Sequence, residues 1–158
     1  MSTDGPTTLA TFAATLPILL VAHNLADHVT GQTHKQATTK GAPSPEQIAA
    51  GADPHSGWAA LLGHVAWYHA TLAAVGALAW LALPIHWSAP GAAAALAWSA
   101  LTHGFIDRRW PVRRLLTAMG KRGYAELASG GMNGMYQVDQ ALHHTMLLAS
   151  AVLAVVIR

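Results

Sequence analysis

Three times along this chain, a histidine and an aspartate stand four residues apart, inside or at the edge of an apolar segment. The pairs are His23/Asp27, His103/Asp107 and Asp139/His143. Positions i and i+4 of an α-helix lie on one face, a turn apart, so each pair presents an imidazole and a carboxylate in the same direction. Such a pair can hold a metal ion or move a proton. Because ionisable groups are costly in an apolar segment, their presence there predicts a functional site.

Imidazole and carboxylate ligands predict a divalent metal, with zinc first and manganese or iron as alternatives. The chain has no cysteine, which excludes thiolate ligands. The predicted ligands are His23, Asp27, His64, His103, Asp107, Asp139 and His143. Because this set exceeds the tetrahedral shell of one zinc ion, it fits two ions, or one ion with orienting residues around it. His23 and Asp27 are the predicted catalytic residues, with His23 as ligand or general base.

The elements that must position these residues are apolar helices. Of the 158 residues, 53% are hydrophobic and 10% are charged, against roughly 25% charged in a soluble domain. Four apolar blocks, at residues 9–26, 58–83, 89–106 and 138–157, approach the ~20 residues that span a bilayer. The sequence therefore predicts an all-α fold, a four-transmembrane-helix bundle that forms a single integral membrane domain over residues 1–158.

Basic residues set the predicted orientation. The 108–136 connection carries six Lys or Arg residues and a single acidic residue, Glu126, so the positive-inside rule places it in the cytoplasm. Four spans then put both termini outside and the 28–57 connection also inside, giving two longer cytoplasmic loops. The expected location is a bacterial inner (cytoplasmic) membrane, crossed several times. In this topology all seven predicted ligands lie within roughly two helical turns of the cytoplasmic surface.

The basic connection also predicts contacts with anionic groups. Arg108 and Arg109 adjoin Asp107, and with Gln32 they are predicted to contact a substrate or a lipid headgroup, since arginine binds phosphate bidentately. Alternatively, the arginines only set the topology and attract anionic lipid. Membrane lipids are the expected partners, and nucleic acid is not, because the arginines adjoin a membrane segment. Homo-oligomerisation or another membrane partner stays open.

Several motifs carry a resemblance to a known family. HNLADHVTGQ from His23 with Lys40, GHVAWYHATL from Gly63, LTHGFID from Leu101 and YQVDQALHH from Tyr136 resemble the DUF3307 family of small bacterial and phage-encoded membrane proteins. The resemblance covers nearly the whole chain outside the loops, and it implies a topology and motif positions without a reaction. Those positions are His23, Asp27, Gln32, His64, His103, Asp107, Asp139, Gln140 and His143. The chain departs from the family in its longer 28–57 connection and its glycine-rich 130–134 segment.

Two further resemblances bear on function. Membrane-bound metal-dependent hydrolases are similar in placing His and Asp at helix ends. Cation-diffusion zinc transporters resemble the chain in the spacing of HNLAD and HGFID, but they usually have more spans and a cytoplasmic metal-binding domain. The leading hypothesis is a metal-dependent hydrolase of a lipid or phosphorylated substrate, with its metal centre at the cytoplasmic interface.

Two alternatives stay open. The first is a metal-ion or proton transporter, which the scarcity of polar residues in the outer halves of the spans disfavours. The second is a structural or partner-binding membrane subunit, because polar side chains also join membrane helices without doing chemistry.

Overall fold

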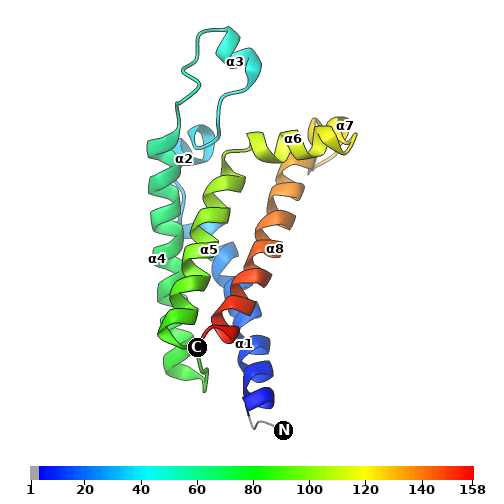
Figure 1. Cartoon of the computed structure of the whole chain (residues 1–158). Coiled ribbons are helices and arrows are strands. Elements are labelled where there is room, and N and C mark those ends of the chain that lie inside the picture. The colour runs from blue at the N-terminus through cyan, green and yellow to red at the C-terminus, as the bar shows by residue number, and fades with distance from the viewer. Residues whose placement is uncertain (1–3) are drawn as a thin grey trace.

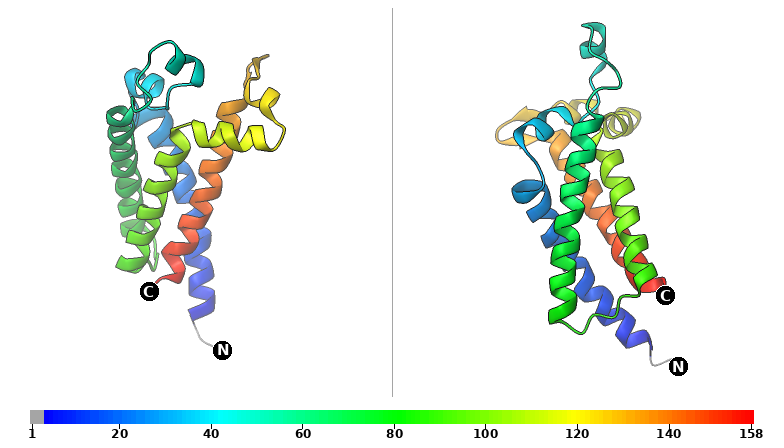
Figure 2. Two further views of the ribbon diagram at one scale, coloured as in Figure 1. Left: turned by 45° about the horizontal axis from the view of Figure 1, so that its top comes forward. Right: turned by 90° about the vertical axis from the view of Figure 1, so that its left-hand side faces the viewer.

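Four long helices run side by side in the structure, a computed structural model that describes residues 4–158 (Figure 1). They are α1 (Asp4–Leu25), α4 (Trp58–Ala82), α5 (Ala89–Asp107) and α8 (Gly134–Val156). The beginning of α1 and the end of α8 lie at one end of the bundle, which we call the terminal end (Figure 2). The connections 26–57 and 108–133 lie at the other end, which we call the loop end. The predicted all-α fold is confirmed, apart from one short hairpin.

Within the described residues, three helices are long and apolar enough to cross a membrane: Gly5–Thr30, Trp58–Ala82 and Gly134–Val156. The fourth predicted span, α5, has 19 residues and is not among them, because alanine, glycine and polar residues make up most of its sequence. Helix α5 nevertheless packs along both α8 and α4. Its small residues permit this close packing: a Cβ at Gly91 would lie 2.7 Å from the carbonyl oxygens of Ala154 and Ile157.

The two long connections contain short helices. The first holds α2 (His34–Thr39) and α3 (Pro45–Ala49), and the second holds α6 (Trp110–Ala118) and α7 (Arg122–Ala125). Both α2 and α3 begin with a capping box, in which a hydroxyl and a glutamine satisfy the first backbone N–H groups. The glycine-rich segment forms a hairpin, β1 (Ala128–Ser129) with β2 (Met132–Asn133). Its turn places Gly130 and Gly131 at φ 59° and 79°, which glycine adopts without strain.

Arg108 joins the two connections at the point where α5 ends. Its Nη1 donates hydrogen bonds to the carbonyl oxygens of Ser56 (2.9 Å) and Lys40 (3.3 Å). Its own carbonyl oxygen accepts one from the backbone N–H of Ala42 at 3.0 Å, and its guanidinium stacks 4.5 Å from the ring centroid of Trp58. These contacts fix the segment around Lys40 against the end of the bundle.

Candidate metal centre at the loop end

Five ionisable side chains meet in the interior of the loop end: Asp27, Lys40, His64, His103 and Asp107. Each is at most 5% exposed. They come from two of the four long helices, α4 and α5, and from the first connection, so only the tertiary structure brings them together. Burying this many charged groups is costly unless they neutralise one another or hold an ion.

Four acceptor atoms converge in the cluster, and one of them is Nε2 of His64. Its Nε2 lies 2.9 Å from Nε2 of His103, 3.1 Å from Oδ2 of Asp107 and 3.2 Å from Oδ1 of Asp27. The same Oδ2 of Asp107 lies 3.1 Å from Nε2 of His103. Two imidazole nitrogens and two carboxylate oxygens therefore face one another at contact distance.

The hydrogen bond on the far side of His64 determines what its Nε2 can do. Nδ1 donates to the carbonyl oxygen of Gly31 at 2.9 Å, because a carbonyl can only accept. In the neutral imidazole, Nε2 then carries a lone pair that points at two carboxylates. Oδ1 of Asp27 and Oδ2 of Asp107 are buried and have no hydrogen bond of good geometry. The Lys40 ammonium is one cation that these facing lone pairs contact, and a metal ion could be a second, since a ligand imidazole is commonly oriented by a backbone carbonyl in this way.

His143 supplies a further free nitrogen. Its Nδ1 lies 2.9 Å from the carbonyl oxygen of Asp139 and 3.3 Å from Oδ2 of the same residue. Its Nε2 is buried without a hydrogen-bond partner. Two groups could hold a metal ion, Asp27/His64/His103 and His103/Asp107/His143, each with its ligand atoms within 4.8 Å of one another. His103 belongs to both groups, and nitrogen with carboxylate oxygen suits zinc, manganese or iron.

His23 acts on this cluster from outside. Its Nε2–H donates to Oε1 of Gln140 at 3.0 Å, and its Nδ1 accepts from the hydroxyl of Tyr68 at 2.8 Å. The amide of Gln140 in turn donates to Oδ2 of Asp27 at 3.1 Å. This chain of hydrogen bonds fixes the carboxylate so that its other oxygen, Oδ1, faces His64.

Lys40 is the member of the cluster that the sequence did not identify as a site residue. Its Nζ lies 2.9 Å from Oδ2 of Asp107 and 3.7 Å from Oδ1 of Asp27, and 3.0 Å from Nε2 of His64. The ammonium offsets part of the carboxylate charge. The only signal in the sequence was its place in the first motif, since a residue between helices follows no periodicity.

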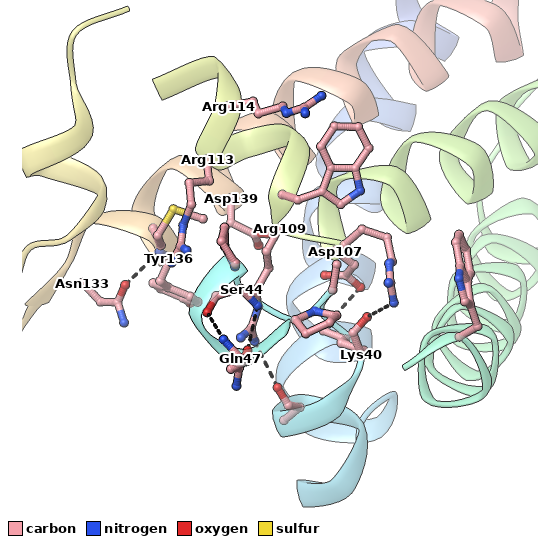
Figure 3. Close-up of a pocket in the computed structure, with 18 of the residues that line it drawn as sticks. Lys40, Ser44, Gln47, Asp107, Arg109, Arg113, Arg114, Asn133, Tyr136 and Asp139 are labelled. Atoms are coloured by element: carbon pink, nitrogen blue, oxygen red, sulfur yellow. Dashed lines mark hydrogen bonds and ion pairs between the residues drawn. The ribbon is translucent and has the colours of Figure 1, made fainter. Parts of the chain in front are cut away.

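The cluster forms the floor of a cavity of about 1300 Å³ that opens at the loop end. Asp27, Lys40 and Asp107 lie at the floor. The wall includes side chains from α3, α6 and the beginning of α8, among them Ser44, Gln47, Arg109, Arg113, Asn133, Tyr136 and Asp139 (Figure 3). The cavity therefore borders three residues of the cluster, while the converging oxygens Oδ1 of Asp27 and Oδ2 of Asp107 are themselves buried.

The predicted ligands thus divide into two sets. The structure brings together Asp27, His64, His103, Asp107 and His143. It leaves His23 and Asp139 outside both groups: His23 has hydrogen bonds at both ring nitrogens, and Asp139 pairs with His143. Each contacts a residue of these groups, His23 through Gln140 and Asp139 directly, and so would orient a ligand if a metal ion were bound.

The three residues predicted to contact a substrate, Gln32, Arg108 and Arg109, differ in burial and in their hydrogen bonds. Arg108 is 5% exposed and donates to backbone carbonyls, so its role in the fold is that of a clamp. Arg109 is exposed and lines the cavity. Gln32 lines the cavity too, while its amide donates to the carbonyl oxygen of Asp27 at 2.7 Å.

Comparison with protein-family models, curated proteins and solved structures found no match. The resemblance to the DUF3307 family therefore stays a prediction from the motifs.

Proposed function

We propose that this chain is an integral membrane protein that binds one or two divalent ions, zinc first, and hydrolyses a lipid or phosphorylated substrate at its loop end. One observation supports the metal centre above all others. Carboxylate and imidazole acceptors of Asp27, His64, His103 and Asp107 face one another in a buried cluster, at the floor of an open cavity.

The arrangement of the helices supports four membrane crossings. Helix α5 packs between elements of the bundle that are apolar enough to span, so a bilayer around α4 and α8 would also surround α5. An even number of crossings agrees with the common end at which α1 begins and α8 ends. The arginines of the 108–122 segment lie at the loop end, and the positive-inside rule would place this end in the cytoplasm of a bacterial cell.

The proposed reaction adds water across an ester bond. The hydroxyl of water joins the phosphorus or the acyl carbon, the bond to the leaving oxygen breaks, and the remaining proton passes to that oxygen. A bound divalent ion would supply Lewis-acid activation of water and of the phosphoryl or acyl oxygen. Asp27 lies on the cavity floor and is the proposed proton acceptor, with His23 and Gln140 holding its carboxylate in position. Lys40 brings a fixed positive charge to the same floor, which would stabilise developing negative charge.

Metal content tests this proposal first. Protein purified in detergent without chelator should carry a stoichiometric divalent metal, and Asp107→Asn should lose it. The matched control is Asp53→Asn, which removes one carboxylate from an exposed turn and should leave metal content unchanged. Metal-free wild-type protein would contradict the metal centre. Absence of phosphate or fatty-acid release from lipids by the metal-loaded protein would contradict hydrolysis.

One observation favours transport as a second candidate. The outer halves of the spans were predicted to be nearly free of polar residues, yet the hydroxyls of Thr11 and Ser150 are buried near the terminal end without a hydrogen-bond partner. A second cavity, of about 560 Å³, opens at that end and includes Thr11 in its wall. Metal flux into proteoliposomes, abolished by Asp107→Asn, would favour transport over hydrolysis.

A further inference from the structure

The wall of the loop-end cavity carries more positive charge than its floor neutralises. Among its lining residues are five basic side chains, Lys40, Arg108, Arg109, Arg113 and Arg114, and three carboxylates, Asp27, Asp107 and Asp139. Lys40 is paired with the floor carboxylates, and Arg108 is occupied by backbone carbonyls. The positive charge left over therefore belongs to the arginines at and after the start of α6.

Arg109 and Arg113 are four residues apart, and the backbone N–H of Arg113 donates to the carbonyl oxygen of Arg109 at 2.9 Å. They consequently lie on one side of the first turn of α6. In Figure 3 both extend to the side where Tyr136, Ser44 and Gln47 lie, whereas Arg114 extends to the other side. Arg114 stacks there on Trp110, 5.0 Å from the ring centroid.

The backbone at Arg109 is unusual. Its φ of 62° makes it the only non-glycine residue with positive φ within residues 4–158. Such a conformation is strained for a side chain with a Cβ, and it persists only where the surroundings enforce it. Here it turns the chain from α5 into α6 and sends the Arg109 guanidinium toward α2, where Nη2 donates to the carbonyl oxygen of Ala37 at 3.0 Å.

Arg113 is the donor that remains open. Its side chain has no hydrogen bond or ion pair with any residue in the described range 4–158. The exposed carboxylate of Glu46 interacts with Arg113 electrostatically without forming an ion pair. A guanidinium that lines a cavity in this way is suited to bind an anion, and its planar fork matches two oxygens of a phosphate.

Helix α6 also indicates where that anion comes from. It lies across the loop end rather than along the bundle (Figure 1), and its buried Val112 and Leu116 pack against α8. Trp110 and Leu115 on this helix are each 45% exposed, and Met119, which directly follows it, is 56% exposed. A basic helix with exposed apolar side chains is typical of one that lies in the headgroup region of a membrane.

From these observations we infer that Arg113, together with Arg109, binds the phosphate group of a membrane amphiphile in the loop-end cavity. The inference rests on the proposed function, since it names the substrate class of the same site. It requires the phosphate to sit above the carboxylate floor while the acyl chains stay in the surrounding lipid beside α6.

Binding measured without turnover tests the inference. Detergent-purified protein in chelator is titrated calorimetrically with short-chain phosphatidic acid, with diacylglycerol of the same chain length, and with glycerol 3-phosphate. Phosphatidic acid should bind. Diacylglycerol, which lacks the phosphate, and glycerol 3-phosphate, which lacks the acyl chains, should each bind at least about tenfold more weakly. If glycerol 3-phosphate binds as tightly as phosphatidic acid, the phosphate need not belong to a membrane amphiphile, and that part of the inference is overturned. If diacylglycerol binds as tightly, the proposed phosphate site is overturned.

Two charge variants complete the experiment. Arg113→Gln should weaken phosphatidic acid binding about tenfold, the cost of losing a hydrogen bond to a charged group. Arg122→Gln removes the same charge from the same basic segment outside the cavity, where its ion pair with Glu126 is exposed, and should change little. Equal weakening in both variants would overturn the assignment to Arg113.

The two proposals can fail separately. Chelator removes any metal-dependent reaction, so phosphatidic acid binding that depends on Arg113 would stand even if no hydrolysis were found. Conversely, metal binding and hydrolysis without dependence on Arg113 would overturn this inference alone.

Discussion

At the terminal end of the bundle, buried polar groups join neighbouring segments, whereas at the loop end they converge on a common point. Near the terminal end, the Thr15 hydroxyl donates to the carbonyl oxygen of Thr11 at 2.6 Å and accepts from Nε1 of Trp87 at 2.8 Å. The hydroxyl of Ser88 bridges the carbonyl oxygen of Ile157 and the backbone N–H of Gly91. Two of these bonds connect separate segments, Trp87 with α1 and Ser88 with the end of the chain, whereas the other two are local.

At the loop end the count of donors and acceptors is uneven. Oxygens of Asp27 and Asp107 and nitrogens of His103 and His143 are buried without hydrogen bonds. Near the terminal end the buried groups without a partner are the hydroxyls of Thr11 and Ser150, whereas at the loop end they are ionisable groups that meet in one cluster. Burial of polar residues is thus common to both ends, and the convergence of ionisable atoms from several segments on one cluster marks the loop end as the candidate binding centre.

The largest effect on this comparison is expected from Asp107→Asn. The variant removes one converging oxygen and leaves the buried Lys40 ammonium without its closest partner, 2.9 Å away in the wild type. We expect loss of bound metal and a destabilisation of about 3 kcal/mol, as for other broken buried ion pairs. Elemental analysis and thermal unfolding in detergent measure the two effects.

A double variant separates charge from metal binding. Adding Lys40→Met to Asp107→Asn removes the unpaired ammonium and leaves the Asp27 carboxylate with His64 as its neighbour, so it should recover part of the lost stability but should not restore metal. Full metal content in Asp107→Asn would show that the buried polar groups of the loop end, like those of the terminal end, only join neighbouring segments.

Gly31→Ala should have the next largest effect. A Cβ at Gly31 would collide with the carbonyl oxygen of Ala26, and Gly31 also supplies the carbonyl that orients His64. We expect a loss of about 2 kcal/mol in unfolding free energy, from overpacking, with weaker metal binding. Gly123→Ala is the control, because a Cβ there meets nothing within 4 Å; equal effects of the two changes would contradict the steric argument.

Gln140→Leu should weaken metal binding with less effect on folding. The amide links His23 to Asp27, and removal of such an orienting residue typically lowers metal affinity by about 10-fold or more. A competition titration with a chelator of known affinity measures the change. Gln137→Leu, an exposed position on the same helix, should leave the affinity unchanged, and a similar loss there would refute the role of the hydrogen-bond chain.

The smallest effect is expected at the terminal end. Trp87→Phe removes the hydrogen bond to Thr15, and such bonds contribute about 0.6 kcal/mol between membrane helices. Stability in detergent should fall by that amount, and metal content should not change. Loss of metal in this variant would mean that the two ends are coupled and that their comparison does not hold.

The i, i+4 rule succeeded where the helix is regular. In α5 it correctly paired His103 with Asp107, at 3.1 Å, and in α8 it paired Asp139 with His143, at 3.3 Å. At the end of α1 it did not pair His23 with Asp27. Residues Ala26–Thr30 form a π-helical turn, closed by a bond from the backbone N–H of Gly31 to the carbonyl oxygen of Ala26 at 2.6 Å. The wider turn rotates Asp27 off the face of His23, and Gln140 bridges the two.

The all-helical bundle, and the level along it at which the ionisable residues gather, follow from the amino-acid sequence alone. Apolar runs of spanning length and the position of each His and Asp within them were enough, because helical rise converts sequence position into depth. Sequence also placed Asp27, His64, His103 and Asp107 in one layer.

Which atoms in that layer face one another depends on the tertiary structure. Lys40 lies in the cluster because Arg108, from a distant part of the chain, hydrogen-bonds to its segment. His23 is linked to Asp27 only through the side chain of Gln140, a residue of α8. Neither relation follows a period along the chain, since each depends on how separate helices are rotated and packed. The depth of a residue follows from its position in one helix, whereas the geometry of a binding centre depends on how several helices pack together.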